Sequence, residues 1–146
     1  MQKLIPPYLF LMSLFLIAGA SYACFIRDHA LVFNPWGVIP FVAGLLIAVF
    51  AKKQFRQHRT TVQTFAAPDT LVTTGLFRHS RNPMYLGFLI ALSGAAFATQ
   101  CALSAMVVLG FFAACRCWYI AHEERVMQAG FGDAYRQYCA QTRRWI

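Results

Sequence analysis

Charged side chains are scarce in this sequence, and acidic ones are the scarcest. Only 12% of the 146 residues are charged and 59% are hydrophobic, and Asp and Glu together number 5 against 13 Lys and Arg. Soluble domains are usually about 25% charged and about 45–50% apolar. The shortage of charge therefore excludes an ordinary soluble domain. The net charge of +8 could suggest a nucleic-acid partner. Binding of nucleic acid needs a basic face on a soluble fold, however, and the apolar composition excludes such a fold.

The sequence also lacks a metal-binding pattern, internal repeats and low-complexity tracts. The nearest approach to a metal motif is "CRC" at residues 115–117, which has too short a spacing for a zinc site and no second pair. Cys24 and Cys101 lie beside apolar stretches, where a disulfide is conceivable in an oxidising compartment. We favour their more ordinary role as small apolar residues.

Four apolar stretches fill most of the chain, at residues 4–26, 32–51, 84–99 and 101–121. A membrane-spanning helix needs roughly 20 residues, with a range of about 17–25. The first, second and fourth stretches meet this need, and the third meets it if it is tilted or starts below the bilayer surface. Only Gln100 separates the third and fourth, which predicts a tight helical hairpin. We predict an all-α integral membrane protein of about four transmembrane helices, the first two within residues 1–51.

The basic residues predict the orientation of these helices, because cytosolic loops carry the excess of Lys and Arg. Lys3 precedes the first stretch, and Arg27 alone lies between the first and second. The others lie between the second and third stretches or near and beyond the inner end of the fourth: Lys52, Lys53, Arg56, Arg59, Arg78, Arg81, Arg116, Arg125, Arg136, Arg143 and Arg144. Both termini are therefore predicted to lie in the cytosol.

Two polar segments are predicted to lie at the cytosolic membrane surface. The cluster "KKQFRQHR" at residues 52–59 indicates a helix end held at anionic lipid head groups. Residues 122–146 mix charged and aromatic side chains at helical spacings, which predicts an interfacial helix broken at Gly130 and Gly132. Between these segments, "TLV" at residues 70–72 is expected to be extended.

The most concentrated polar motif is "GLFRHSRNPMYLG" at residues 75–87, at the mouth of the third apolar stretch. A helix that starts at Pro83 would have Asn82 as its N-cap, and both residue types are favoured at these positions. The free N–H groups of a helix start bind carboxylates and phosphates. Taken alone, the motif fits a capped helix with snorkelling arginines as well as it fits a ligand site.

The second polar motif is "HEER" at residues 122–125, at the inner end of the fourth stretch. Because the third and fourth stretches form a hairpin, Glu123 and Glu124 are expected to return beside Arg81 and Asn82. An interfacial ion pair would explain this arrangement. Ionisable groups near membrane depth favour the alternative, which is a functional cavity.

Together the two motifs resemble the isoprenylcysteine carboxyl methyltransferase family. The resemblance runs from "TLVTTGLFRHSRNPMYLG" through the hairpin to "EE", "FGDAYRQY" and "TRRWI", and it covers about residues 69–146. Membrane phospholipid methyltransferases are close in pattern. The combination of motifs and their spacing is specific, whereas the first two helices carry no recognisable signature. Residues 52–146 would accordingly form the catalytic region.

The resemblance implies an enzyme that takes S-adenosylmethionine on the cytosolic side and methylates a lipid or lipid-modified acceptor in the membrane. The residues that match the family's cofactor positions are Thr70, Leu71, Val72, Phe77, Asn82, Pro83, Met84, Tyr85 and Glu123. A helix start and Arg81 suit the cofactor's carboxylate, and Glu123 or Glu124 suits its ammonium and ribose hydroxyls. The face of an aromatic ring suits its sulfonium.

The chain departs from the family pattern at three positions. Asp69 and Asn82 stand where relatives commonly have histidine, and Tyr119 stands where relatives often have an arginine directed at the substrate. The nearest arginine to that position is Arg116. With these substitutions, the catalytic residues are predicted to be Arg81, Arg116, Tyr119 and Glu124.

Two acceptors and one non-enzymatic role stay open. A carboxylate acceptor needs no general base, whereas a protonated lipid amine does. The candidate bases are Glu124, His79 and His122, and such histidines are more often interfacial hydrogen-bond partners. This favours the carboxylate of an isoprenylcysteine-like substrate over a phospholipid amine. The alternative of another class is a membrane scaffold subunit that keeps the motif for packing. The sequence leaves the oligomeric state open.

Overall fold

The computed structural model describes residues 6–28, 33–57 and 70–146, and every regular element within these ranges is helical. The long helices are α1 (Pro6–Asp28), α2 (Val38–Gln57), α3 (Pro83–Thr99), α4 (Ala102–Ala114) and α5 (Ala121–Gln141). Two 3-10 turns, η1 (Pro35–Gly37) and η2 (Gly75–Arg78), and a π-helical segment, η3 (Cys115–Ile120), complete the elements. The all-α prediction is confirmed. Lys3, Arg59 and Asp69 lie outside the described residues.

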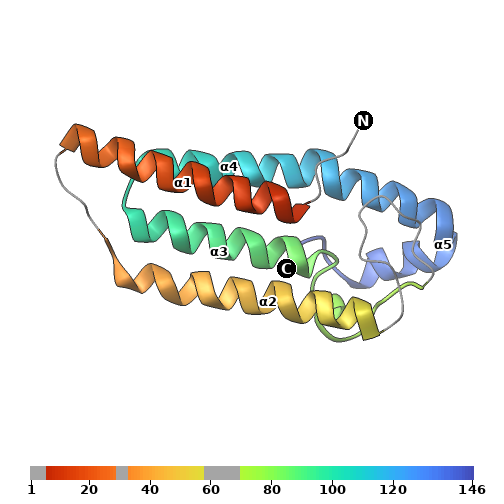
Figure 1. The fold of residues 1–146 in the computed structure, drawn as a ribbon. Coiled ribbons are helices and arrows are strands. Elements are labelled where there is room, and N and C mark those ends of the chain that lie inside the picture. The colour runs from red at the N-terminus through yellow and green to blue at the C-terminus, as the bar shows by residue number, and fades with distance from the viewer. Residues whose placement is uncertain (1–5, 29–32, 58–69) are drawn as a thin grey trace.

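The helices lie side by side, with α3 at the centre of the bundle (Figure 1). α3 packs against α2 on one side and against α1 and α4 on the other. The starts of α1 and α3 and the end of α2 lie at the same end of the bundle, which also holds α5. We call this the polar end, because the "RHSRNP" and "HEER" motifs meet there.

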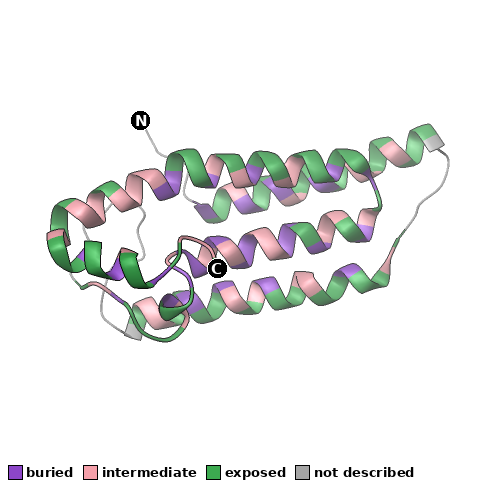
Figure 2. Ribbon diagram, turned by 180° about the vertical axis from the view of Figure 1, so that it is seen from behind, coloured by how far each residue is buried: buried purple, intermediate pink, exposed green. Residues whose placement is uncertain are grey.

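Figure 2 shows that much of the outward surface of the bundle is exposed. Many of the exposed side chains are large and apolar, such as Phe15 on α1, Val49 on α2 and Met106 on α4, which are 78%, 61% and 66% exposed. Among the described residues, three helices are long and apolar enough to cross a membrane, and the shorter α3 is also apolar. The most apolar window of α1 has only 17% of its residues buried. Water would not tolerate such faces, so they are the lipid-facing surface of an integral membrane protein.

Glycines bring α2 and α3 into backbone contact. A Cβ added at Gly87 would lie 2.6 Å from the carbonyl oxygen of Gly44, and one at Gly94 would lie 2.4 Å from the backbone nitrogen of Phe41. Small residues permit this approach between membrane helices, where packing replaces the hydrophobic effect as the driving force. The contact fixes the position of α3, whose first turn carries the "NPMY" motif.

The hairpin of α3 and α4 is confirmed, and a helix follows it. Gln100 takes a left-handed conformation (φ 52°) and Cys101 caps α4. The helical run then continues through η3 into α5 without a break at residue 121. The predicted C-terminal helix is present as α5, and it follows η3 directly because the change from apolar to polar side chains at His122 alters the surroundings and not the backbone. The chain breaks at Gly132 (φ 51°, ψ −118°) as predicted, whereas Gly130 stays helical.

Cys24 and Cys101 form a disulfide, which corrects the preference for small apolar residues. The bond joins the last turn of α1 to the start of α4, at the opposite end of the bundle from the polar end. The tight turn at Gln100 places Cys101 beside α1, and its Cα lies 6.4 Å from that of Cys24. This separation is within the usual range for a disulfide.

Candidate functional site

The segment before α3 is folded against the end of α2. Residues 71–73 have no regular secondary structure, and η2 follows them after Thr74, whose backbone is extended. Val72 and Phe77 are buried against Ala51 of α2. The ring of Phe77 meets that of Phe55 edge to face, with centroids 4.6 Å apart. The segment therefore presents a fixed apolar wall to the polar end of the bundle.

Asn82 occupies the N-cap position of α3, and Pro83 is the first helical residue. The predicted capping bond is absent, because the Asn82 side chain does not accept from the helix N–H groups. Its amide instead donates to the backbone carbonyl of Arg144 at 3.0 Å. The N–H groups of the first turn of α3 are thus left uncapped by Asn82, and Asn82 ties the C-terminal residues to the motif.

Tyr85 and Glu123 meet across the hairpin. The Tyr85 hydroxyl donates to Oε1 of Glu123 at 2.7 Å, and the Tyr85 side chain is only 3% exposed. The ring of Tyr119 lies on the same side, with its centroid 6.3 Å from that of Tyr85. The π-helical geometry of η3 changes the helical register just before Glu123. Such segments are frequent at functional sites.

Glu124 lies between two arginines. Nε of Arg144 donates to it at 2.9 Å and Nη2 of Arg144 donates to its second oxygen, while Nη1 of Arg81 lies 3.3 Å away. The predicted return of the two glutamates to the start of α3 is therefore confirmed. A carboxylate held by a bidentate arginine is among the strongest ion pairs that proteins form. This pair fixes the C-terminal residues over the start of α3.

Arg81 is the most enclosed cation of the cluster. Burial disfavours the charge of its guanidinium, but the Cys139 thiol and the Glu124 carboxylate favour it, and the pKa of Arg81 is raised. Its Nη1 donates to the Cys139 sulfur at 2.7 Å, and its backbone N–H donates to the carbonyl of Arg143 at 3.0 Å. Arg81 therefore remains a cation at any physiological pH.

The C-terminal residues close the polar end of the bundle. After the break at Gly132 the chain turns back, and the Tyr138 hydroxyl donates to the carbonyl of Phe77 at 2.7 Å. Residues 142–146 then run past the start of α3, and Trp145 packs on Phe112 of α4. Sequence reasoning missed Tyr138 and Arg144 as site residues. Both residues lie within the family-like motifs "FGDAYRQY" and "TRRWI", which were the sequence signal that could have identified them.

Comparison with known proteins gives one match. The sequence model of the phospholipid methyltransferase family matches residues 33–134. The chain belongs to the phospholipid methyltransferase family. No curated protein and no solved structure matches the chain. The family match includes α2, which carries no recognisable motif, and it ends before Tyr138 and Arg144. As a member of this family the protein is a membrane methyltransferase.

The residues predicted from the motifs do not all gather in one place. Val72, Phe77, Asn82, Pro83 and Tyr85 are buried at the polar end, and Leu71, Met84 and Glu123 are half-buried. Thr70 and Arg116 are exposed, Arg116 on the outer face of η3. Arg116 therefore lies apart from the pairs that Glu124 makes. Arg144, and not Arg116, pairs with Glu124.

The polar end has hydrogen-bond donors that suit the carboxylate of S-adenosylmethionine. Within the described part of the chain, Nε of Arg81 and the indole N–H of Trp145 are buried without a hydrogen-bond partner. Buried donors are normally satisfied, so two orphans beside an uncapped helix start favour an anionic ligand. The carboxylate of S-adenosylmethionine is such a ligand, and Glu123 offers an acceptor for its ammonium or hydroxyl groups. The residues present fit this cofactor.

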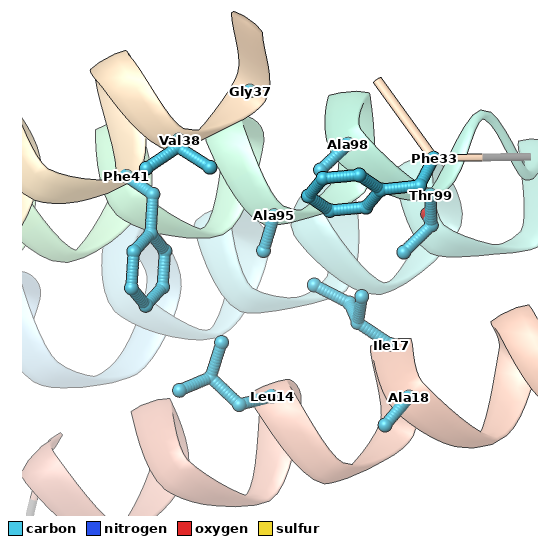
Figure 3. Close-up of a pocket in the computed structure, with 10 residues that line it drawn as sticks. All are labelled: Leu14, Ile17, Ala18, Phe33, Gly37, Val38, Phe41, Ala95, Ala98 and Thr99. Carbon is cyan, nitrogen blue, oxygen red and sulfur yellow. The ribbon is translucent and has the colours of Figure 1, made fainter. Parts of the chain in front are cut away.

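A separate cavity of about 320 Å³ lies towards the disulfide end of the bundle (Figure 3). Side chains of α1, α2 and α3 and their connections line it, among them Leu14, Phe41 and Ala95. Its lining is almost entirely apolar. It holds none of the predicted site residues, so it has no part in binding a polar cofactor.

Proposed function

We propose that this family member transfers a methyl group from S-adenosylmethionine to a lipid acceptor embedded in the membrane, at the polar end of the bundle. The observation that carries the proposal is the meeting of Tyr85 and Glu123 beside the Arg81–Glu124–Arg144 cluster. An apolar bundle gains nothing in packing from such a cluster, because taking charges out of water is costly. A site for a polar cofactor explains why it is there.

Each part of the cofactor has a partner among these residues. The start of α3 and Arg81 would hold the carboxylate, and Glu123 would hold the ammonium or the ribose hydroxyls. The rings of Phe77 and Tyr85 are buried at this end, and the face of either ring would suit the sulfonium cation. The cofactor supplies an electrophilic methyl group when bound. The chain's own task is then to hold an acceptor in line with that methyl, at about 3–3.5 Å.

We infer that the acceptor is a phospholipid amine, because the match is to the phospholipid methyltransferase family. Such an amine must lose a proton before it can attack. Both oxygens of Glu124 are held by Arg144, so we assign the acceptance of that proton to His122 or to the Glu123 carboxylate. A carboxylate acceptor is the second candidate, because a carboxylate needs no base. The ion pairs of Glu124 with arginine favour it, since they make Glu124 a poor base.

The cofactor would enter from the cytosol, with both termini on that side. The distribution of basic residues supports this orientation, because most lie at the polar end. The Cys24–Cys101 disulfide supports it independently, because it lies at the opposite end and disulfides persist in oxidising compartments. Exposed Lys52, Lys53 and Arg56 at the end of α2 would then meet anionic lipid head groups.

Binding of S-adenosylhomocysteine, the product of the cofactor, tests the site. The purified protein in detergent should be stabilised by this ligand, by about 2.7 kcal/mol at 100 times its dissociation constant. Tyr85→Phe and Glu123→Gln should weaken binding by about ten- to a hundredfold, because each loses a hydrogen bond involving a charged group. Tyr22→Phe, on an exposed tyrosine of α1, and Asp133→Asn, on an exposed carboxylate, are the matched controls. Absence of any stabilisation at millimolar ligand would favour the scaffold role instead.

A further inference from the structure

The last turn of α2 reaches the cofactor motif through a single amide side chain. Oε1 of Gln54 accepts a hydrogen bond from the backbone N–H of Leu76 at 3.0 Å. Nε2 of Gln54 donates to the backbone carbonyl of Thr74 at 3.5 Å. One side chain of α2 therefore bridges both sides of the turn at Gly75, which lies more than 20 residues further along the chain.

The turn is shaped to receive this amide. Gly75 has φ +60°, a conformation that other residues seldom adopt, and a Cβ placed there would clash with the Gln54 amide. The backbone angle therefore favours glycine, and a larger residue would displace the amide from the turn. Two independent features of one residue point to a close fit between Gln54 and the turn.

The Gly75 turn also sets the position of Phe77. Phe77 follows Gly75 by two residues, within the same 3-10 turn, and its side chain is 4% exposed. Phe55, next to Gln54 on α2, packs edge to face on the Phe77 ring. The carbonyl of Phe77 is held from the other side by the Tyr138 hydroxyl at 2.7 Å. The η2 segment is therefore hydrogen-bonded on two sides, to Gln54 of α2 and to Tyr138 of α5.

We propose that Gln54 is a positioning residue for the cofactor site, acting through the backbone at residues 74–76 to place the Phe77 wall. The proposal rests on the proposed function, because Phe77 matters in this way only if the cofactor binds there. It makes α2 a working part of the enzyme as well as a membrane anchor. A neutral hydrogen bond contributes enough to change an equilibrium by about two- to tenfold. The loss of Gln54 should weaken cofactor binding within that range.

Three variants of the full-length protein in detergent test the role. Gln54→Leu keeps the side chain's size and removes both hydrogen bonds. Gln54→Glu keeps an acceptor for the Leu76 N–H and removes the donor to Thr74. Lys53→Ala alters the exposed neighbour and serves as the control. Affinity for S-adenosylhomocysteine is measured by titration on folded protein, and hydrogen exchange of the Leu76 amide is measured without ligand.

The expected order of affinity is wild type and Lys53→Ala, then Gln54→Glu, then Gln54→Leu, with the last about two- to tenfold weaker than wild type. The Leu76 amide should exchange faster in Gln54→Leu and stay protected in Gln54→Glu. A purely structural role would lower the melting temperature and leave the affinity of the folded protein unchanged. Wild-type affinity in Gln54→Leu, or a Gln54→Glu variant that binds no better than Gln54→Leu, would overturn the proposal.

The outcomes separate this proposal from the function on which it rests. If the wild type does not bind S-adenosylhomocysteine, the proposed function fails, and hydrogen exchange still decides whether Gln54 holds the turn. If Gln54→Leu does not fold, Gln54→Asn takes its place, because its amide is one methylene too short to reach the Leu76 N–H. Unchanged exchange of the Leu76 amide in Gln54→Leu, or in Gln54→Asn where that variant replaces it, would show that Gln54 does not hold the turn.

Discussion

Gly87→Ala is predicted to destabilise the bundle although alanine is the better helix former. The added Cβ would lie 2.6 Å from the carbonyl oxygen of Gly44 and 2.7 Å from the backbone nitrogen of Ala48. Close carbon–oxygen contacts in proteins are about 3.3–3.6 Å, so α2 and α3 must separate by roughly 0.7 Å. Gaps of about 0.5–1 Å already lose a quarter to a half of the dispersion attraction between facing atoms.

The expected net effect is a loss of about 2 kcal/mol. Overpacking costs about 1–3 kcal/mol, and backbone atoms on both sides of Gly87 place this case at the upper end. Replacing a helical glycine by alanine returns about 1 kcal/mol. At about 2–4 °C per kcal/mol for a chain of this size, the melting temperature should fall by about 4–8 °C.

Gly110→Ala is the matched control, because Gly110 is also helical and a Cβ there would meet nothing within 4 Å. It should gain the helix propensity without the clash and raise the melting temperature by about 2–4 °C. Thermal unfolding of both variants in the same detergent measures the difference in sign. If Gly87→Ala raised the melting temperature as Gly110→Ala does, the backbone contact between α2 and α3 would be refuted.

Two further variants test the ion pairs and the disulfide. Glu124→Gln should lower the free energy of unfolding by about 1.5–3 kcal/mol, because it leaves Arg81 and Arg144 without their carboxylate. Asp133→Asn, in an exposed ion pair, should cost less than about 1 kcal/mol. Equal melting temperatures of the two variants would contradict this prediction. Cys24→Ser should cost about 2–4 kcal/mol, since the bond closes a loop with a sequence separation of 77. Reduction of the wild type should have the same effect, and a melting temperature that reducing agent does not change would show that the bond does not form.

The hairpin and the meeting of its inner ends could be predicted from the sequence. Only Gln100 separates α3 from α4, so the inner end of α4 had to return to the start of α3. Hairpin geometry therefore placed Glu123 and Glu124 near Arg81 without any knowledge of side-chain packing. The start of α3 was predictable for a similar local reason, because Pro83 can begin a helix but not continue one.

The remaining parts of the site depend on tertiary contacts that local patterns do not encode. The role of Arg144 requires the chain to turn back at Gly132, and a glycine signals the break but not its direction. The contact of Gln54 with the Gly75 turn joins two segments that have no shared periodicity. The disulfide needs the register of α1 against α4, which two uniformly apolar helices leave undetermined in the sequence. Asn82 was placed correctly, but its side chain is drawn to the Arg144 carbonyl instead of the helix N–H groups.

Transfer of a radiolabelled methyl group tests the central claim most directly. The purified protein in bilayer nanodiscs would receive labelled S-adenosylmethionine together with either an amine-bearing phospholipid or an isoprenylcysteine-like acid. We predict label in the lipid fraction with the phospholipid, which base does not release as methanol, and the loss of this label in Glu123→Gln. Base-labile label found only with the acid would move the assignment to the carboxylate acceptor. Label in neither lipid, at cofactor concentrations well above the dissociation constant, would contradict the claim that this site transfers methyl groups to membrane lipids.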